Sequence, residues 1–246
     1  MDRVLIAISL IASGAAALAA VAPGYEKDIF PTSRGDLEIA FLGHGTLMMA
    51  FEGKVIHVDP YGEVADYASL PKADLVLVTH DHFDHLDPAA FKAILKPGTA
   101  VVGASSCRGK LPSDAVILAN GESRTVLGIA IEAVPAYNIA HKRPDGHPFH
   151  PKGAGNGYVV TFADKRIYIA GDTENTPEMK ALKGIDAAFL PMNLPYTMDP
   201  EQAADAARAF RPKVLYPYHF GDTDTSRLVR LLKAEKDIEV RIRKMS

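Results

Sequence analysis

The stretch that decides the interpretation of this chain is LVLVTHDHFDH, residues 75–85. Its apolar first half predicts a strand that is buried on both faces. The polar second half holds three histidines and two aspartates within six residues, although the whole chain has only nine histidines. Imidazole and carboxylate are the ligands that zinc and neighbouring first-row metals prefer. A turn of this composition at the end of a buried strand predicts a metal site.

The motif within this stretch, His-x-His-x-Asp-His, resembles the signature of the metallo-β-lactamase superfamily. Two further landmarks of that superfamily precede it, LGHG at 42–45 and VDP at 58–60, and two follow it, AGDT at 170–173 and YPYH at 216–219. The resemblance therefore extends over residues 37–219. It is strongest toward the branch of metal-dependent hydrolases that are similar to ascorbate-6-phosphate lactonase and, more distantly, to N-acyl-phosphatidylethanolamine phospholipase D.

The apolar runs along the chain predict an α/β fold. Strands are expected over residues 37–42, 46–51, 55–58, 75–79, 99–104, 116–118, 125–134, 158–162, 166–170, 187–190 and 214–216. Helices are expected over residues 88–95, 177–182, 200–210 and 227–236. These runs are compatible with several layered α/β arrangements. The resemblance implies one of them, a four-layer αββα sandwich.

The chain divides into an apolar N-terminal segment and one larger domain. Residues 1–22 contain an Ala-rich apolar run after a short polar start, which predicts a signal peptide. An uncleaved membrane anchor is the first alternative, since about 20 apolar residues span a bilayer, and a cytosolic helix is the second. Residues 23–246 are long enough for one domain with a single core. We expect an exported protein, periplasmic or secreted, that meets the membrane only if the segment is retained.

Charge and cysteine content narrow the choice of partners. The net charge is −3 with acidic and basic residues interspersed, which disfavours nucleic acid binding. The single cysteine, Cys107, allows no intrachain disulfide and is expected to be a small core residue. The expected partner is a small-molecule substrate, and the oligomeric state is left open.

The resemblance implies two adjacent divalent metal ions, with zinc favoured over manganese or iron. The implied ligands are His80 and His82 for the first ion, Asp84, His85 and His219 for the second, and Asp172 as a bridge between the two. All of them follow predicted strands, where a rigid sheet can fix a side chain that a loop exposes. Asp84 is also the expected catalytic residue, which orients the attacking water or moves its proton.

The third ligand of the first ion is left open by the sequence. Many relatives have a histidine shortly after a Val-Pro-Ala strand end, and this chain has Asn138 there. Three histidines of the following long loop are the alternatives: His141, His147 and His150. We favour His150, because it lies nearest the next strand and Pro151 restricts its backbone to extended conformations. Asn138 would then hold a ligand or contact the substrate.

Further residues are candidates for roles around the metals. Asp59, at the end of a strand, would accept the free ring N–H of a metal-binding histidine, or alternatively only start a turn. His44 lies between two glycines and would reach the site as a substrate or proton-transfer group, or alternatively be a turn residue. The candidate substrate contacts are Asn193, Tyr196, Thr197 and Lys152.

The predicted function is a metal-dependent hydrolase. Two divalent ions lower the pKa of a bridging water, so that hydroxide is available near neutral pH to attack a carbonyl carbon or a phosphorus. The expected substrate is a small ester, lactone, amide or phosphoester, with carboxylic acid derivatives favoured over phosphodiesters. The alternatives are a metal-binding domain of this fold without turnover and an iron oxidoreductase of the flavodiiron kind.

Overall fold

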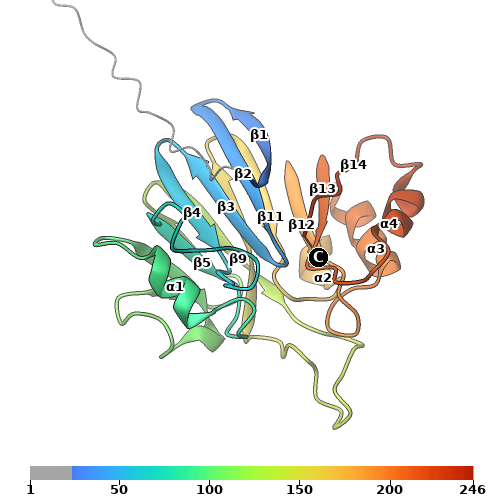
Figure 1. The fold of residues 1–246 in the computed structure, drawn as a ribbon. Coiled ribbons are helices and arrows are strands. Elements are labelled where there is room, and N and C mark those ends of the chain that lie inside the picture. Colours follow the sequence, from blue (N-terminus) through green and yellow to red (C-terminus); the bar gives the residue numbers. More distant parts are fainter. Residues whose placement is uncertain (1–23, 246) are drawn as a thin grey trace, which may run out of the picture.

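The computed structural model describes residues 24–245 and contains two seven-stranded sheets that pack face to face (Figure 1). The first sheet consists of β1 (Glu26–Thr32), β2 (Gly35–Gly43), β3 (Thr46–Phe51), β4 (Lys54–Val58), β5 (Leu75–Val78), β6 (Ala100–Ala104) and β7 (Val116–Leu118). Strands β1 to β4 form an antiparallel meander, and β4 to β7 are parallel. The parallel pairing brings the carboxyl ends of β4 and β5 to one edge of the sheet.

The second sheet repeats this plan. It consists of β8 (Ser123–Val126), β9 (Ile129–Ala136), β10 (Gly155–Phe162), β11 (Lys165–Ile169), β12 (Ala187–Pro191), β13 (Val214–Tyr218) and β14 (Glu239–Val240). Strands β8 to β11 are antiparallel and β11 to β14 are parallel. The residues that follow β11, β12 and β13 therefore lie at a common edge, as do those of the first sheet.

Helices cover the outer faces of both sheets (Figure 1). They are α1 (Pro88–Ile94), α2 (Pro177–Lys180), α3 (Pro200–Phe210) and α4 (Thr225–Leu232), and a short 3₁₀ helix spans Ser105–Cys107. Buried apolar residues form three clusters: one between the sheets, one between the first sheet and α1, and one between the second sheet and α2 to α4. Each apolar cluster thus lies between two neighbouring layers, and the layers follow in the order helices, sheet, sheet, helices. This is the αββα sandwich, so the predicted fold is confirmed.

The predicted starts of α1, α2 and α3 agree with the structure. Asp87 caps α1 by accepting hydrogen bonds from the backbone N–H groups of Ala89 and Ala90. Asp199 and Gln202 form a capping box at the start of α3. Each of these helices has proline at its first turn, where the missing N–H costs no hydrogen bond.

Several predicted bounds were wrong. The predicted strand over 125–134 is divided into two strands, β8 and β9, at Gly128, where the sequence predicts a turn or bulge. Leu127 and Gly128 both have positive φ and form this turn. The last helix begins and ends earlier than the predicted 227–236, because Asp224 caps it by accepting from Ser226 N. Strands β1 and β14 were not predicted, since β1 is largely exposed and β14 has only two residues.

The predicted signal peptide or anchor lies outside the described residues. Within residues 24–245, no helix is long and apolar enough to cross a membrane.

Candidate metal centre

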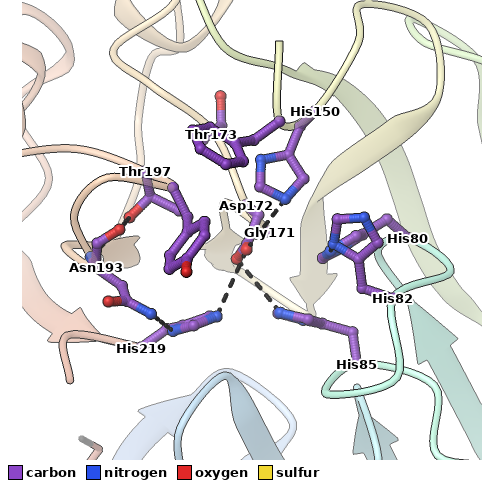
Figure 2. Close-up of polar contacts among 12 residues, drawn as sticks. His80, His82, His85, His150, Gly171, Asp172, Thr173, Asn193, Thr197 and His219 are labelled. Atoms are coloured by element: carbon purple, nitrogen blue, oxygen red, sulfur yellow. Dashed lines mark hydrogen bonds and ion pairs between the residues drawn. The ribbon is translucent and has the colours of Figure 1, made fainter. Parts of the chain in front are cut away.

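The metal-competent side chains gather where the parallel strands of both sheets end (Figure 2). His80, His82 and His85 follow β5, Asp172 follows β11, and His219 follows β13. These five residues come from segments up to 139 positions apart in the chain. The site is therefore a product of the shared edge of the two sheets.

One group of possible ligands consists of His80, His82 and His150. One ring nitrogen from each lies within 4.8 Å of the others. His80 Nε2 and His82 Nδ1 are 3.1 Å apart, and His150 Nε2 is 3.3 Å from Asp172 Oδ2. Figure 2 shows His150 directed toward Asp172 from the side opposite His85 and His219.

The second group consists of His44, Asp84, His85 and His219, whose ligand atoms also lie within 4.8 Å of one another. Asp172 touches this group as well. Its Oδ1 is 3.4 Å from His85 Nε2, and its Oδ2 is 3.5 Å from His219 Nε2. Asp172 thus stands between the two groups, which is the position that a bridging carboxylate requires.

The unsatisfied atoms of this cluster fit bound cations. Among residues 24–245, six buried side-chain polar atoms lack a hydrogen-bond partner, and three of them are His85 Nε2, Asp172 Oδ1 and His219 Nε2. Buried polar atoms in folded proteins are almost always paired. Lone pairs of imidazole and carboxylate that face each other without a proton donor form a donor set for divalent metals such as zinc, manganese or iron.

The electrostatics of the cluster also favour positive charge. Burial lowers the pKa of His219, but the carboxylates of Asp172 and Asp84 outweigh it and raise that pKa to about 10. Burial would raise the pKa of Asp172, yet the neighbouring His219 and His85 hold it well below its usual range. The carboxylates are therefore ionised at neutral pH, and a metal ion that binds there would replace protons on the imidazoles.

Asp59 holds one histidine of each group. Its Oδ2 lies 2.9 Å from His85 Nδ1, and it also accepts a hydrogen bond from Thr79 Oγ1 at 2.6 Å. Thr79 Oγ1 in turn lies 3.1 Å from His80 Nδ1. These contacts orient both rings so that the Nε2 atoms of His80 and His85 are available to a metal. The sequence pointed to Asp59, and Thr79 was missed because a threonine at a strand end has no distinctive pattern.

Asn138 holds His150, which is one of the two roles predicted for it. Its Oδ1 accepts hydrogen bonds from His150 N at 2.7 Å and from His150 Nδ1 at 2.9 Å. Its Nδ2 donates to Glu174 Oε1 and to the backbone carbonyl of Tyr196. Asn138 is buried and does not line the pocket, so it has no surface for a substrate.

Glu174, which the sequence reasoning missed, anchors the loop that carries these residues. Its carboxylate is buried and accepts hydrogen bonds from the backbone N–H groups of Ala140 at 2.9 Å and His141 at 2.7 Å. The ring of His141 faces a backbone carbonyl at 2.8 Å, and His147 is exposed. Of the three loop histidines, His150 is the one that lies with His80 and His82. The sequence feature that could have pointed to Glu174 is its position directly after the Gly-Asp-Thr landmark.

His44 lies at the edge of the centre in an unusual backbone conformation. Its φ is 52°, and Asp59 and His219 also have positive φ, which is uncommon for residues other than glycine and concentrates at functional sites. His44 Nε2 is 3.0 Å from Asp84 Oδ2, and its ring packs against that of His219 with centres 3.6 Å apart and planes tilted by 40°. The next residue must be small, because a Cβ on Gly45 would lie 2.9 Å from His85 Cε1.

A pocket of about 320 Å³ opens over the centre. Its lining residues are His82, Asp84, Arg143, Phe149, His150, Asp172, Asn193, Tyr196 and His219. Two of the predicted substrate contacts, Asn193 and Tyr196, are therefore in place. Arg143 and Phe149 were missed, because the loop that carries them has no apolar periodicity.

Two other candidate substrate contacts, Thr197 and Lys152, do not line the pocket and fit the alternatives of a loop-packing residue and a surface lysine. Thr197 is fully buried, and its Oγ1 accepts a hydrogen bond from Asn193 N at 2.7 Å, so it shapes the loop from within. Lys152 is exposed outside the pocket, where its Nζ lies 2.6 Å from Glu178 Oε1 and above the ring of Tyr137. Neither side chain reaches the space over the metal centre.

Comparison with known proteins places this site in a family. Residues 38–219 match the model of the β-lactamase superfamily domain. The chain is 34% identical over 194 residues to a UPF0173 metal-dependent hydrolase of Thermus thermophilus, covering 75% of this chain and 84% of the relative. A similar protein of Methanopyrus kandleri is 31% identical over 201 residues, with the same coverage.

Solved structures agree with this assignment. A crystal structure described as a metal-dependent hydrolase from Parabacteroides distasonis has a TM-score of 0.85 and 48% identity, covering 90% of this chain and all of the other. A metallo hydrolase of Ignicoccus hospitalis, at 24% identity and a TM-score of 0.69, covers 84% of this chain and 94% of its own and shows the shared fold. The chain therefore belongs to the metallo-β-lactamase superfamily.

Proposed function

We propose that this protein is a metal-dependent hydrolase that uses two divalent ions to cleave a small ester, lactone, amide or phosphoester. The observation that carries the proposal is the place of Asp172 between two groups of ligand atoms, with three buried atoms there lacking partners. The names of the relatives from Thermus thermophilus and Methanopyrus kandleri support the same reaction class.

We assign the ligands to two ions by the grouping of their atoms, except that His44 of the second group is assigned to proton transfer, because the resemblance implies only Asp84, His85 and His219 as ligands there. His80, His82 and His150 would hold one ion, Asp84, His85 and His219 the other, and Asp172 would bridge them. Divalent ions in these positions would lower the pKa of water toward neutrality and polarise the carbonyl or phosphoryl oxygen of the substrate. We favour zinc, because imidazole and carboxylate ligands without cysteine are common in catalytic zinc sites.

Asp84 and His44 are placed to move a proton. Burial would raise the pKa of Asp84, but the neighbouring imidazoles of His219, at 3.7 Å, and His44, at 3.0 Å, hold it far below its usual range, so the carboxylate is ionised. Burial lowers the pKa of His44, which leaves its imidazole neutral near pH 7. We assign Asp84 as the group that orients the attacking water, because a carboxylate with so low a pKa is a weak base, and the neutral imidazole of His44 as the group that accepts the proton. His44, 3.0 Å away, would pass that proton to solvent.

The size of the pocket supports a small substrate. Its volume of about 320 Å³ is at the lower end of the roughly 300–1,000 Å³ that is typical of small-molecule sites. The charge balance of the chain, −3 overall, disfavours nucleic acid as a substrate. We further propose export to the periplasm or beyond, on the composition of residues 1–22 alone. N-terminal sequencing of protein from the producing cell tests it, and an intact Met1 would contradict cleavage.

The experiment that tests the function combines metal analysis with a substrate screen. Purified protein should contain close to two ions per chain. It should hydrolyse at least one member of a set of lactones, esters, amides, phosphomonoesters and phosphodiesters. A chelator should abolish that activity, and added zinc should restore it. One ion or none per chain would refute the dinuclear site, and activity that survives the chelator would refute the mechanism. Two ions without any hydrolysis would favour the metal-binding domain without turnover.

A further inference from the structure

Arg143 is the only lysine or arginine among the residues that line the pocket over the metal centre. Its guanidinium lies 5.2 Å from the centre of the Phe149 ring. Within residues 24–245, no carboxylate lies within ion-pair distance of it. Several other arginines, such as Arg34 with Glu52, form ion pairs at the surface. Arg143 therefore presents a positive charge to the pocket that no acidic side chain neutralises.

The backbone of the loop holds Arg143 in place before any ligand binds. Arg143 N donates to His147 O at 2.8 Å, and Gly146 N donates to Arg143 O at 2.9 Å. Asp145 Oδ1 accepts from His147 N at 3.0 Å, which closes the turn between them. The yellow-green loop that extends below the sheets in Figure 1 contains this turn. A fixed backbone reduces the entropy that a binding residue loses on contact.

An apolar wall lies beside this charge. The rings of Phe149 and Tyr196 pack edge to face with centres 5.0 Å apart, and both line the pocket. Tyr196 is 44% exposed, so its surface is open to a ligand. The acidic residues of the lining are Asp84 and Asp172, and both belong to the metal centre. The part of the pocket away from the metals thus combines one cation with two aromatic faces.

We propose that Arg143 binds an anionic group of the substrate, a carboxylate or a phosphate-like group, while Phe149 and Tyr196 contact an apolar part beside it. The inference rests on the proposed hydrolase function and names the substrate class of that site. A guanidinium presents planar paired donors that match the oxygens of a carboxylate or a phosphate. The substrate would therefore carry its negative charge at the end remote from the bond that is cleaved.

The test compares three phenyl esters that differ only at the remote end: phenyl butanoate, which is neutral, monophenyl succinate, a carboxylate, and phenyl 3-phosphonopropanoate, a phosphonate. The zinc-loaded protein is compared with Arg143→Ala and with Arg124→Ala. Arg124 is a matched control, because it is also without an ion-pair partner among the described residues and lies in a different surface hollow. The wild type should prefer one anionic ester over the neutral ester in kcat/KM, and whichever anion is preferred identifies the group.

Arg143→Ala should lower kcat/KM for the preferred anion by about 10- to 100-fold, mainly through KM, because a charge-assisted contact is lost. It should lower kcat/KM for the neutral ester much less than for the anion and leave the metal content unchanged, and added guanidinium should restore part of the loss. Arg124→Ala should behave as the wild type. Equal losses for neutral and anionic esters, or no loss at all, would overturn the assignment of Arg143.

A binding measurement separates this inference from the hydrolase proposal. If the wild type cleaves none of the esters, calorimetry with 4-phenylbutanoate and its neutral amide tests without turnover whether Arg143 binds an anionic group. Tighter binding of the anion by the wild type, lost in Arg143→Ala, would support the anion site even though hydrolysis had failed. The same preference in both proteins would assign the anion to the metal ions and refute the role of Arg143.

Discussion

Replacing Asp59 by asparagine tests whether the metal centre depends on how its histidines are held. The buried carboxylate accepts hydrogen bonds from Thr79 N at 2.8 Å, Thr79 Oγ1 at 2.6 Å and His85 Nδ1 at 2.9 Å. A carboxamide has one acceptor oxygen, so in either orientation at least one of these donors faces an NH₂ group. Asparagine tolerates the positive φ of 47° at this position. Asp59→Asn therefore changes charge and hydrogen bonding without adding backbone strain.

The expected effect has two parts. An unpaired buried donor costs about 1–3 kcal/mol of folding stability. Loss of a group that orients a metal-binding histidine typically weakens metal affinity about 10- to 100-fold, or about 1.4–2.7 kcal/mol. Because Thr79 relays the contact from Asp59 to His80, we expect weaker binding at both ions. If Asp59 acted only through its direct contact with His85, the substitution would weaken binding of only one ion.

Zinc affinity is measured by competition with a chromophoric chelator, and stability by thermal unfolding of the metal-free protein. Asp186→Asn is the matched control, because Asp186 is a buried carboxylate that accepts a hydrogen bond from Arg166 N at 2.9 Å, away from the centre. The control should lower stability and leave zinc affinity unchanged. Wild-type affinity at both ions in Asp59→Asn would refute the role of Asp59, whatever its stability.

Three further predictions test other parts of the structure. His150→Ala should remove one ion per chain and abolish turnover, whereas His147→Ala should change neither the metal content nor the turnover. Metal analysis and rate measurements on both variants check this, and the reverse result would show that His147 is the ligand. Gly45→Ala should reduce activity and metal content, because the new Cβ would displace His85, and wild-type values for both would contradict this close contact. Burial lowers the pKa of His57 from its usual 6.5 to about 4, although a backbone carbonyl contact partly opposes it. Unfolding therefore takes up a proton as the pH falls from about 6.5 to about 4, and metal-free protein should lose about 3 kcal/mol of stability there. His57→Gln should lose that part of the pH dependence, and an unchanged slope would show that other groups cause it.

Local sequence patterns predicted most of the strands, the starts of α1, α2 and α3, and the first part of the metal motif. An apolar run followed by His-x-His-x-Asp-His combines a buried strand and a polar turn, and both depend on residues adjacent in the chain. The capping residues Asp87 and Asp199 are equally local. Asp172 and His219 were found because each follows a strand within a short landmark. The reaction class could therefore be predicted before any coordinates.

The tertiary structure decided which distant side chains meet. Three histidines of one loop were candidates in the sequence, which favoured His150 only by its position before Pro151 and the next strand. His150 lies in the centre because Asn138 and Glu174 hold the loop through contacts that no periodicity reveals. Arg143 likewise became a candidate only once its turn was placed over the pocket. Local pattern in the sequence determined the α/β class and residue type the chemistry of the ligands, whereas the four-layer arrangement was implied by the resemblance. The ligand set, the orientation of the rings and the character of the substrate pocket depend on long-range packing of two sheets.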